Sequence, residues 1–196
     1  MFGADGRRGL VLLALLLTLG ALALGGEPLR DALRYERGAL AAGQWWRLLT
    51  AHAVHLDAAH ALVNAAGLVL VWGIAIDELS ARQWFAVVVA AALAIGAGLW
   101  WLVPGVSWYV GASGVLHGML AAGVLAGARR GDRVAVIALV LLVMKLAYEQ
   151  WQGPLAFTDG KPVVTAAHTL GALGGASVAV LSGRRRTPAA PQAGAR

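Results

Sequence analysis

Residues 84–103 read WFAVVVAAALAIGAGLWWLV, twenty consecutive residues without a charged side chain. A helix of this length rises about 30 Å, the thickness of the hydrocarbon core of a bilayer. The stretch therefore predicts a membrane-spanning helix. Comparable apolar runs cover residues 10–26, 58–77, 112–128, 134–151 and 163–183. We expect an all-α polytopic membrane protein, built as a bundle of six transmembrane helices.

The composition sets the class of protein and the number of domains. Of 196 residues, 59% are hydrophobic and 13% are charged, whereas an average soluble domain has roughly 45–50% and about 25%. Six spans with short loops leave no room for a separate soluble domain. We expect one membrane domain over residues 1–183 and a basic, disordered cytoplasmic tail over residues 184–196. The absence of cysteine excludes disulfides and thiolate metal sites.

Basic residues lie before the first apolar run, between the second and third, between the fourth and fifth, and after the sixth. With six spans they all lie on one side of the membrane, which is the positive-inside pattern and places both termini in the cytoplasm. They are Arg7, Arg8, Arg82, Arg129, Arg130, Arg133, Arg184, Arg185 and Arg186. A second interpretation makes the first run a signal peptide, cleaved after Ala21-Leu22-Ala23. No aromatic residue or folded module accompanies the basic tail, so we expect the lipid bilayer and no nucleic acid as a partner.

A long polar segment, residues 27–57, separates the first two runs and lies outside by the charge rule. Apolar and charged residues over 29–40 have helical spacing, which predicts a short amphipathic helix in the membrane interface. Trp45 and Trp46 mark the headgroup level. Arg47 is expected to have a structural role, capping loop carbonyls or contacting lipid phosphate.

Placing a polar side chain in hydrocarbon costs free energy, so such a residue in a membrane span usually has a function. Residues 109–118 read YVGASGVLHG, in which Ser113 and His117 lie four apart at the outer end of the fourth span. His60 and Asn64 have the same spacing in the outer half of the second span, and His168 lies near the start of the sixth. Helix geometry then puts Ser113, His60 and His168 within roughly 10 Å of the outer surface.

Glycines accompany these groups on two of the spans. Gly114 and Gly118 flank Ser113 on the fourth span, and Gly171 and Gly175 follow His168 on the sixth. Small residues at four-residue spacing let membrane helices approach closely. The pattern predicts contact between the fourth and sixth spans, with the Ser113 hydroxyl in reach of His168.

Together these groups supply the parts of an acyl-transfer site. Ser113 is the predicted nucleophile, and His168 is the base that takes its proton and returns it to the leaving amine. His60 and Asn64, with backbone N–H groups near Ser113, are the predicted oxyanion donors. Taken singly, the serine has a simpler interpretation as a packing residue, and each histidine as a donor to a neighbouring carbonyl. The common depth of the set favours catalysis.

The ordered motifs between Trp46 and Gly175 resemble the rhomboid family of intramembrane serine proteases. In chain order they are Trp46-Arg47, His55, His60, Asn64, Gly111-Ala112-Ser113-Gly114, and Ala167-His168 with Gly171 and Gly175. The resemblance implies a six-helix rhomboid-like bundle with an outside first loop. It also implies that Ser113 and His168 form a catalytic dyad, that His60 and Asn64 stabilise the oxyanion, and that membrane-anchored proteins are cut near the extracytoplasmic face.

One position departs from the family pattern. Many rhomboids carry a tyrosine four residues after the serine, stacked beneath the catalytic histidine, whereas this chain has His117. This difference, the small size and the stretch from Lys145 through Glu149 to Trp151 resemble the rhombosortase subgroup. The subgroup implies cleavage of C-terminal Gly-rich sorting tails in a bacterial inner membrane, with the site facing the periplasm. The residues expected to support the site are Gly111, Gly114, His117, Gly171 and Glu149.

Lys145 and Glu149 stand four apart in the fifth span and have two interpretations. As an ion pair they neutralise each other where isolated charges are costly. Alternatively, Glu149 orients His168 as a third member of the site.

Two other functional classes compete with a protease: a metal-dependent protein and a non-catalytic membrane protein. His52, His55 and His60 lack a known zinc spacing, so we expect no metal and no cofactor. The alternative function is a non-catalytic rhomboid-like binding protein or a membrane transporter. Loss of Ser113 or His168 would indicate that alternative, and both residues are present.

Overall fold

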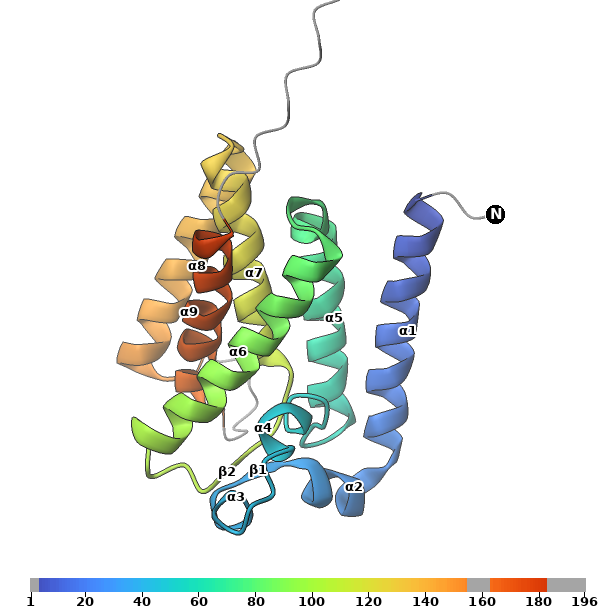
Figure 1. The fold of residues 1–196 in the computed structure, drawn as a ribbon, viewed down its shortest axis with the longest axis vertical. Coiled ribbons are helices and arrows are strands. Elements are labelled where there is room, and N and C mark those ends of the chain that lie inside the picture. Colours follow the sequence, from blue (N-terminus) through green and yellow to red (C-terminus); the bar gives the residue numbers. More distant parts are fainter. Residues whose placement is uncertain (1–3, 155–162, 183–196) are drawn as a thin grey trace, which may run out of the picture.

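The computed structural model describes residues 4–154 and 163–182, and the chain is mostly helical over them. The long helices follow the six apolar runs closely (Figure 1), and they are α1 (Ala4–Leu24), α5 (Ala58–Ala75), α6 (Ala81–Trp101), α7 (Ser113–Arg129), α8 (Arg133–Gln152) and α9 (Thr165–Leu181). The predicted disordered tail, residues 184–196, lies outside the described residues.

Length and composition support fewer spans than six. Within the described residues, three helices are long and apolar enough to cross a membrane: α5 with its 3-10 extension η1 (Ile76–Glu78), α6, and α8. The first apolar run could cross a membrane only if α1 and α2 (Gly26–Leu33) together count as one span. The chain bends by 108° between these two helices. Helix α9 is apolar but shorter. The six-span topology therefore stays a prediction.

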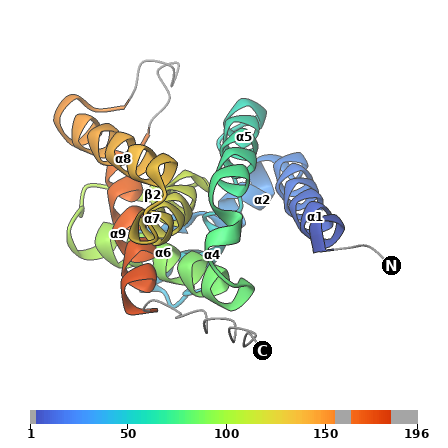
Figure 2. The ribbon, with the colours of Figure 1, turned by 90° about the horizontal axis from the view of Figure 1, so that it is seen from above.

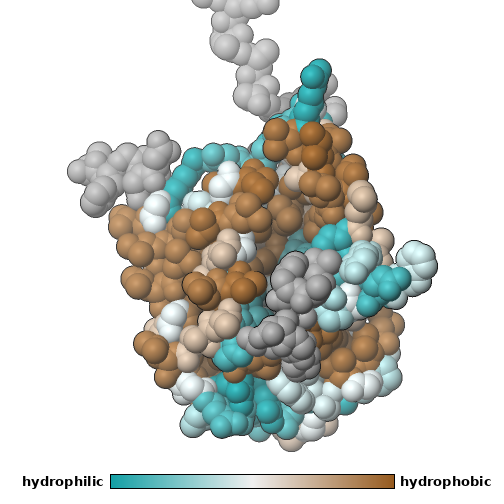
Figure 3. Space-filling model, turned by 180° about the vertical axis from the view of Figure 1, so that it is seen from behind, coloured by the Kyte–Doolittle hydropathy of each residue, from teal (hydrophilic) through white to brown (hydrophobic). Residues whose placement is uncertain are grey.

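The surface of the bundle suits a bilayer. Large apolar side chains are exposed on several helices, and Figure 3 shows them as a band above a hydrophilic end of the molecule. Examples are Leu62, Phe85, Val134, Met144 and Leu173. A soluble monomer rarely exposes a continuous apolar surface of this kind, so the chain is a membrane protein.

Helix α7 is the centre of the bundle. It packs against α5, α6, α8 and α9 (Figure 2), whereas α1 contacts only α2 and α5 among the main contacts of the described helices. A Cβ added to Gly118 would lie 2.6 Å from the carbonyl oxygen of Gly171. Cβ atoms on Gly171 and Gly175 would overlap the carbonyl oxygens of Gly114 and Gly118. The predicted close approach of the fourth and sixth helices is confirmed.

Replacing Gly171 with alanine should destabilise the protein. The new methyl group meets backbone atoms of Gly114, which cannot move aside as a flexible side chain does. Overpacking of this kind costs about 1–3 kcal/mol or more, so we expect a lower melting temperature in detergent. The matched control is Gly73→Ala on α5, where no atom lies within 4 Å of the added Cβ and the better helix propensity of alanine favours the fold. Equal melting of both variants would show that the α7–α9 contact is not tight.

The end of the bundle that carries the loop between α1 and α5 is partly irregular. It contains α2, β1 (Tyr35–Glu36), α3 (Arg37–Ala41), α4 (Arg47–Thr50) and β2 (Trp108–Tyr109). The amphipathic helix predicted over residues 29–40 is wrong in extent, because α2 ends at Leu33 and Arg34 is extended. Tyr35 then pairs antiparallel with Tyr109 and buries its side chain in the core. This long-range pairing overrides the local helical pattern.

Arg47 holds the loop together. Its guanidinium donates to the carbonyl oxygens of Asp31 and Arg34, both at 2.8 Å, and to the side chain of Gln44 at 2.7 Å. The side chain is buried at the turn that leads into α4. The predicted role of Arg47 in capping loop carbonyls is confirmed.

Three arginines tie helices together at the opposite end of the bundle. Arg8 pairs with Asp77, and Arg130 with Glu78, so the start of α1 and the α7–α8 turn both contact η1. Arg129 donates to the carbonyl oxygen of Ala179 near the end of α9 at 2.9 Å. This end therefore carries Arg8, Arg129 and Arg130, while the loop end carries arginines that bond within the loop or to its neighbours, among them Arg34 and Arg47.

Candidate active site

The backbone before α7 is held in a shape that requires glycine. Gly111 has φ +118°, and a Cβ there would stand 2.8 Å from the His60 ring. Its N–H donates to the carbonyl oxygen of Ala51 at 3.0 Å, and its own carbonyl accepts from the Tyr109 hydroxyl at 2.8 Å. Tyr109 belongs to the short β1–β2 pair. Sequence reasoning missed Tyr109, because nothing local distinguishes it from an interfacial aromatic residue.

Ser113 starts α7 two residues after this turn, opposite His168 on α9. The Ser113 Oγ lies 3.0 Å from Nε2 of His168, within hydrogen-bond distance. His168 is buried, with 5% of its surface exposed. The structure thus brings together the predicted nucleophile and base, 55 residues apart in the chain.

Glu149 lies behind His168 and decides which ring nitrogen carries the proton. Its Oε2 is 2.8 Å from Nδ1 of His168. An ionised carboxylate only accepts, so Nδ1 must hold the hydrogen. Nε2 of His168 then presents a lone pair to the Ser113 hydroxyl, which is the arrangement a general base needs. Of the two interpretations of Glu149, the contact with His168 fits the orienting one.

Lys145 enters the same cluster from α8, one turn before Glu149. Its Nζ donates to Glu149 at 2.8 Å and to Nε2 of His117, and it lies 3.2 Å from Nδ1 of His168. Nδ1 cannot donate to Glu149 and accept from Lys145 at once, so the ammonium hydrogens serve His117 and Glu149. Both interpretations of the Lys145–Glu149 pair therefore describe real contacts. Sequence reasoning missed the link from Lys145 to the histidines.

His117 lies beneath His168, four residues after Ser113 on the same helix. The two imidazole rings stack with centroids 4.2 Å apart and planes 15° from parallel. Nδ1 of His117 lies 2.6 Å from the carbonyl oxygen of Ser113, an acceptor, so Nδ1 carries the proton and Nε2 accepts from Lys145. The imidazole therefore packs under His168 and is fixed at both nitrogens.

The two predicted oxyanion donors, His60 and Asn64, have different contacts. Nδ1 of His60 accepts from the N–H of Leu56 at 3.3 Å, which leaves the ring proton of the neutral form on Nε2, the nitrogen next to Gly111. Asn64 is buried, and its amide donates to the His60 carbonyl at 2.9 Å, within its own helix. The structure thus places the His60 ring beside Gly111, two residues before Ser113. The hydrogen bond of Asn64 goes to the backbone of its own helix and not to Ser113.

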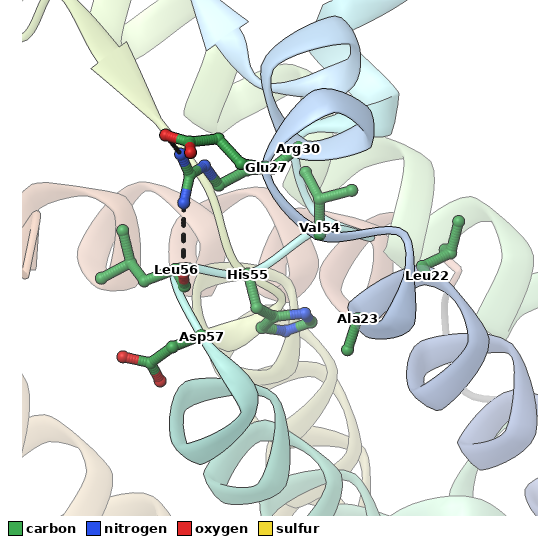
Figure 4. A pocket seen from close by; sticks show the side chains of 9 residues that line it. Leu22, Ala23, Glu27, Arg30, Val54, His55, Leu56 and Asp57 are labelled. Carbon is green, nitrogen blue, oxygen red and sulfur yellow. Dashed lines mark hydrogen bonds and ion pairs between the residues drawn. The ribbon is translucent and has the colours of Figure 1, made fainter.

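A small cavity of about 90 Å³ lies between the α1–α2 bend and the residues that lead into α5. Figure 4 shows the His55 ring beside Ala23, and Arg30 donating to the Leu56 carbonyl at 3.3 Å. His55 is buried, and neither of its ring nitrogens has a partner among the described residues. The His55 ring packs edge-on against the His60 ring, with centroids 5.1 Å apart, and the His52 ring packs in the same way against Tyr109, at 5.6 Å.

The loop histidines predict a pH dependence of stability. Burial lowers the pKa of His52 to about 4, and burial with the nearby His60 lowers the pKa of His55 to about 4. Between pH 6.5 and pH 4 the unfolded chain therefore binds more protons than the folded one, and stability falls as the pH falls. We expect the melting temperature in detergent to drop from pH 7 to pH 5. Replacing His52 and His55 with glutamine should shrink that drop, and an unchanged drop would contradict the assignment.

Comparison with known protein families gives one match. The model of the family described as Rhomboid domain matches residues 42–185, which include α4 to α9 and each of the side chains gathered around Ser113. No curated protein matches the chain.

Proposed function

The chain belongs to the rhomboid family, and we propose that it is an intramembrane serine endopeptidase that cuts membrane-anchored proteins near the extracytoplasmic face. A rhomboid domain suggests intramembrane protease activity in general terms. The observation that carries the proposal for this chain is the 3.0 Å contact between Ser113 Oγ and His168 Nε2. The proposal needs neither a metal nor a cofactor.

In the proposed reaction, Ser113 Oγ attacks the scissile carbonyl carbon while its proton moves to Nε2 of His168. The imidazolium then protonates the leaving amine, and the acyl-enzyme forms as the C–N bond breaks. Water attacks the acyl-enzyme with His168 as base again. Glu149, 2.8 Å from Nδ1, stabilises the positive ring during both steps.

The tetrahedral intermediate needs donors for its oxygen. Backbone N–H groups in the first turn of a helix have no partner within the helix, and the helix dipole makes that end positive. The N–H group of Ser113 is in this position on α7, whereas that of Gly114 bonds the Tyr109 hydroxyl. We propose that the Ser113 N–H acts with Nε2 of His60, and that Asn64 supports His60 through its 2.9 Å bond to the His60 carbonyl.

The proposed topology has six spans, cytoplasmic termini and a site facing the periplasm of a bacterial inner membrane. Its support is that Arg8, Arg129 and Arg130 lie at the end opposite Ser113, whereas Arg30 and Arg34 at the Ser113 end are paired with acidic residues of the same loop. The exposed Trp45 and Trp46 lie on the loop at the Ser113 end, where an outer headgroup layer would be.

The proposed substrates are C-terminal Gly-rich sorting tails of exported proteins, as in rhombosortases. A peptide bond inside a helix has its carbonyl engaged, so the segment must unwind before Ser113 attacks. Glycine costs roughly 1 kcal/mol more than alanine in a helix, which makes a Gly-rich site easier to open. His117, stacked on His168 in place of tyrosine, supports the subgroup.

A direct test compares cells that carry the wild-type chain with cells that carry Ser113→Ala. We expect a small set of exported proteins to keep an uncut C-terminal helix only in the variant, as read by mass spectrometry of protein C-termini. A fluorophosphonate probe should label the purified wild type and not the variant. Identical C-termini together with no labelling would favour a non-catalytic binding protein or a transporter.

A further inference from the structure

The hydroxyl group of Tyr109 lies buried beside the turn that leads into α7. Only 5% of Tyr109 is exposed, and its hydroxyl donates to the carbonyl oxygen of Gly111 at 2.8 Å. The same oxygen accepts from the N–H of Gly114 and lies in hydrogen-bond reach of the Ser113 hydroxyl. A Cβ added to Gly114 would stand 3.2 Å from it. One phenol oxygen therefore contacts both ends of residues 111–114, which we call the serine turn.

We propose that Tyr109 is a positioning residue for the nucleophile: its hydroxyl fixes the serine turn so that Ser113 Oγ stays within reach of His168 Nε2. The hydroxyl has one hydrogen, which goes to the Gly111 carbonyl, so the oxygen is left to accept from the Gly114 N–H. Burial raises the pKa of the Tyr109 hydroxyl, so it keeps this hydrogen at working pH. The positioning role rests on the proposed protease function.

The serine turn lacks the contacts that usually fix the start of a helix. Ala112, the N-cap residue of α7, makes no side-chain hydrogen bond to the first turn, whereas a serine, threonine or aspartate at this position would bond one of the free N–H groups. Gly111, just before it, has φ +118° and no side chain to pack. The Tyr109 hydroxyl thus takes the place of a cap from outside the helix, through its bond with Gly114.

Tyr109 is itself held in place by the loop between α1 and α5. Its backbone pairs with Tyr35 of β1, and its ring packs edge-on against His52, with centroids 5.6 Å apart. The N–H of Gly111 bonds the carbonyl oxygen of Ala51, in the same loop, at 3.0 Å. The hydroxyl therefore has a fixed position from which to hold the serine turn.

Tyr35 offers a matched control in the same pair of strands. It lies across from Tyr109 and is 1% exposed, and its hydroxyl has no hydrogen-bond partner among the described residues. Tyr35→Phe and Tyr109→Phe therefore remove the same atom from two buried, neighbouring rings, and the Tyr109 oxygen is the one that bonds the serine turn. Loss of the Tyr35 hydroxyl removes a buried polar group without a partner, so this variant should be at least as stable as wild type.

The test uses the full chain in detergent, at a temperature well below the melting of every variant. It measures cleavage of a single-span reporter protein with a Gly-rich outer segment, and the rate of labelling by a fluorophosphonate probe. Tyr109→Phe should lower kcat by about 10–100-fold with KM changed less than about 3-fold, because a small misplacement of the nucleophile is costly. Labelling should slow by a similar factor, and Tyr35→Phe should match wild type in both rates. A purely structural role would lower only the melting temperature of Tyr109→Phe.

Each outcome decides a different point. Equal rates of Tyr109→Phe and Tyr35→Phe, with an active wild type, would overturn the positioning role and leave the protease function standing. A wild type that neither cleaves nor labels would contradict the protease function, and the role of Tyr109 with it. Should Tyr109→Phe fail to fold, hydrogen exchange in the wild type decides: the Gly114 amide should exchange more slowly than the Ser113 amide, and equal exchange would overturn the role.

Discussion

Replacing Ser113 with alanine should lower the rate of substrate cleavage by about 10⁴–10⁶-fold, and replacing His168 with alanine should do nearly the same. The Ser113 hydroxyl is a weak nucleophile unless its proton is taken as it attacks, and the contact that allows this is 3.0 Å long. The two residues act as one unit. The double variant should therefore be no slower than either single variant, and single-turnover cleavage of a membrane-anchored substrate measures all three.

The control for this prediction is another serine on a neighbouring helix. Ser177 on α9 donates its hydroxyl to the Gly174 carbonyl at 2.7 Å, so it has a structural partner of its own. Ser177→Ala should cleave within a few-fold of wild type. Multiplicative losses in the Ser113 and His168 double variant would mean that the two side chains act independently, and the dyad would be wrong.

Replacing Glu149 with glutamine should lower kcat by about 10²–10⁴-fold while KM changes little. Glutamine keeps the shape, but its amide donates as well as accepts, so it permits the His168 tautomer with the proton on Nε2. The change also removes the counter-charge from Lys145, whose Nζ lies 3.2 Å from Nδ1 of His168. An unbalanced ammonium there opposes the imidazolium that forms during catalysis.

The neighbouring Gln150 provides the matched control. Its side chain bonds the Thr169 hydroxyl at 3.0 Å, across the same α8–α9 contact, so it has a partner other than His168. Gln150→Ala should retain activity within a few-fold. Nearly full activity of Glu149→Gln would reduce Glu149 to the partner of Lys145 in a structural ion pair, the simpler of the two interpretations.

Sequence reasoning was most successful where the physical signal is local. The six apolar runs coincide with the six long helices, since hydrophobicity and helix formation are properties of short segments. The glycines of α7 and α9 predicted close helix packing for the same reason. The prediction failed over residues 29–40, where pairing of Tyr35 with Tyr109 ends the helix. That contact joins segments far apart in the chain, and no local sequence pattern predicts it.

The sequence by itself determined that this is a membrane protein and that Ser113 and His117 share one helix face, and it predicted that Ser113 and His168 lie close together. The first two follow from hydropathy and from the 3.6-residue repeat of a helix, and the third from the spacing of the glycines. Only the tertiary structure decided that α8 turns Lys145 and Glu149 toward His168, and that His117 stacks beneath it. The rotation of a helix about its own axis is set by how side chains pack between helices, and a periodic sequence leaves that rotation open.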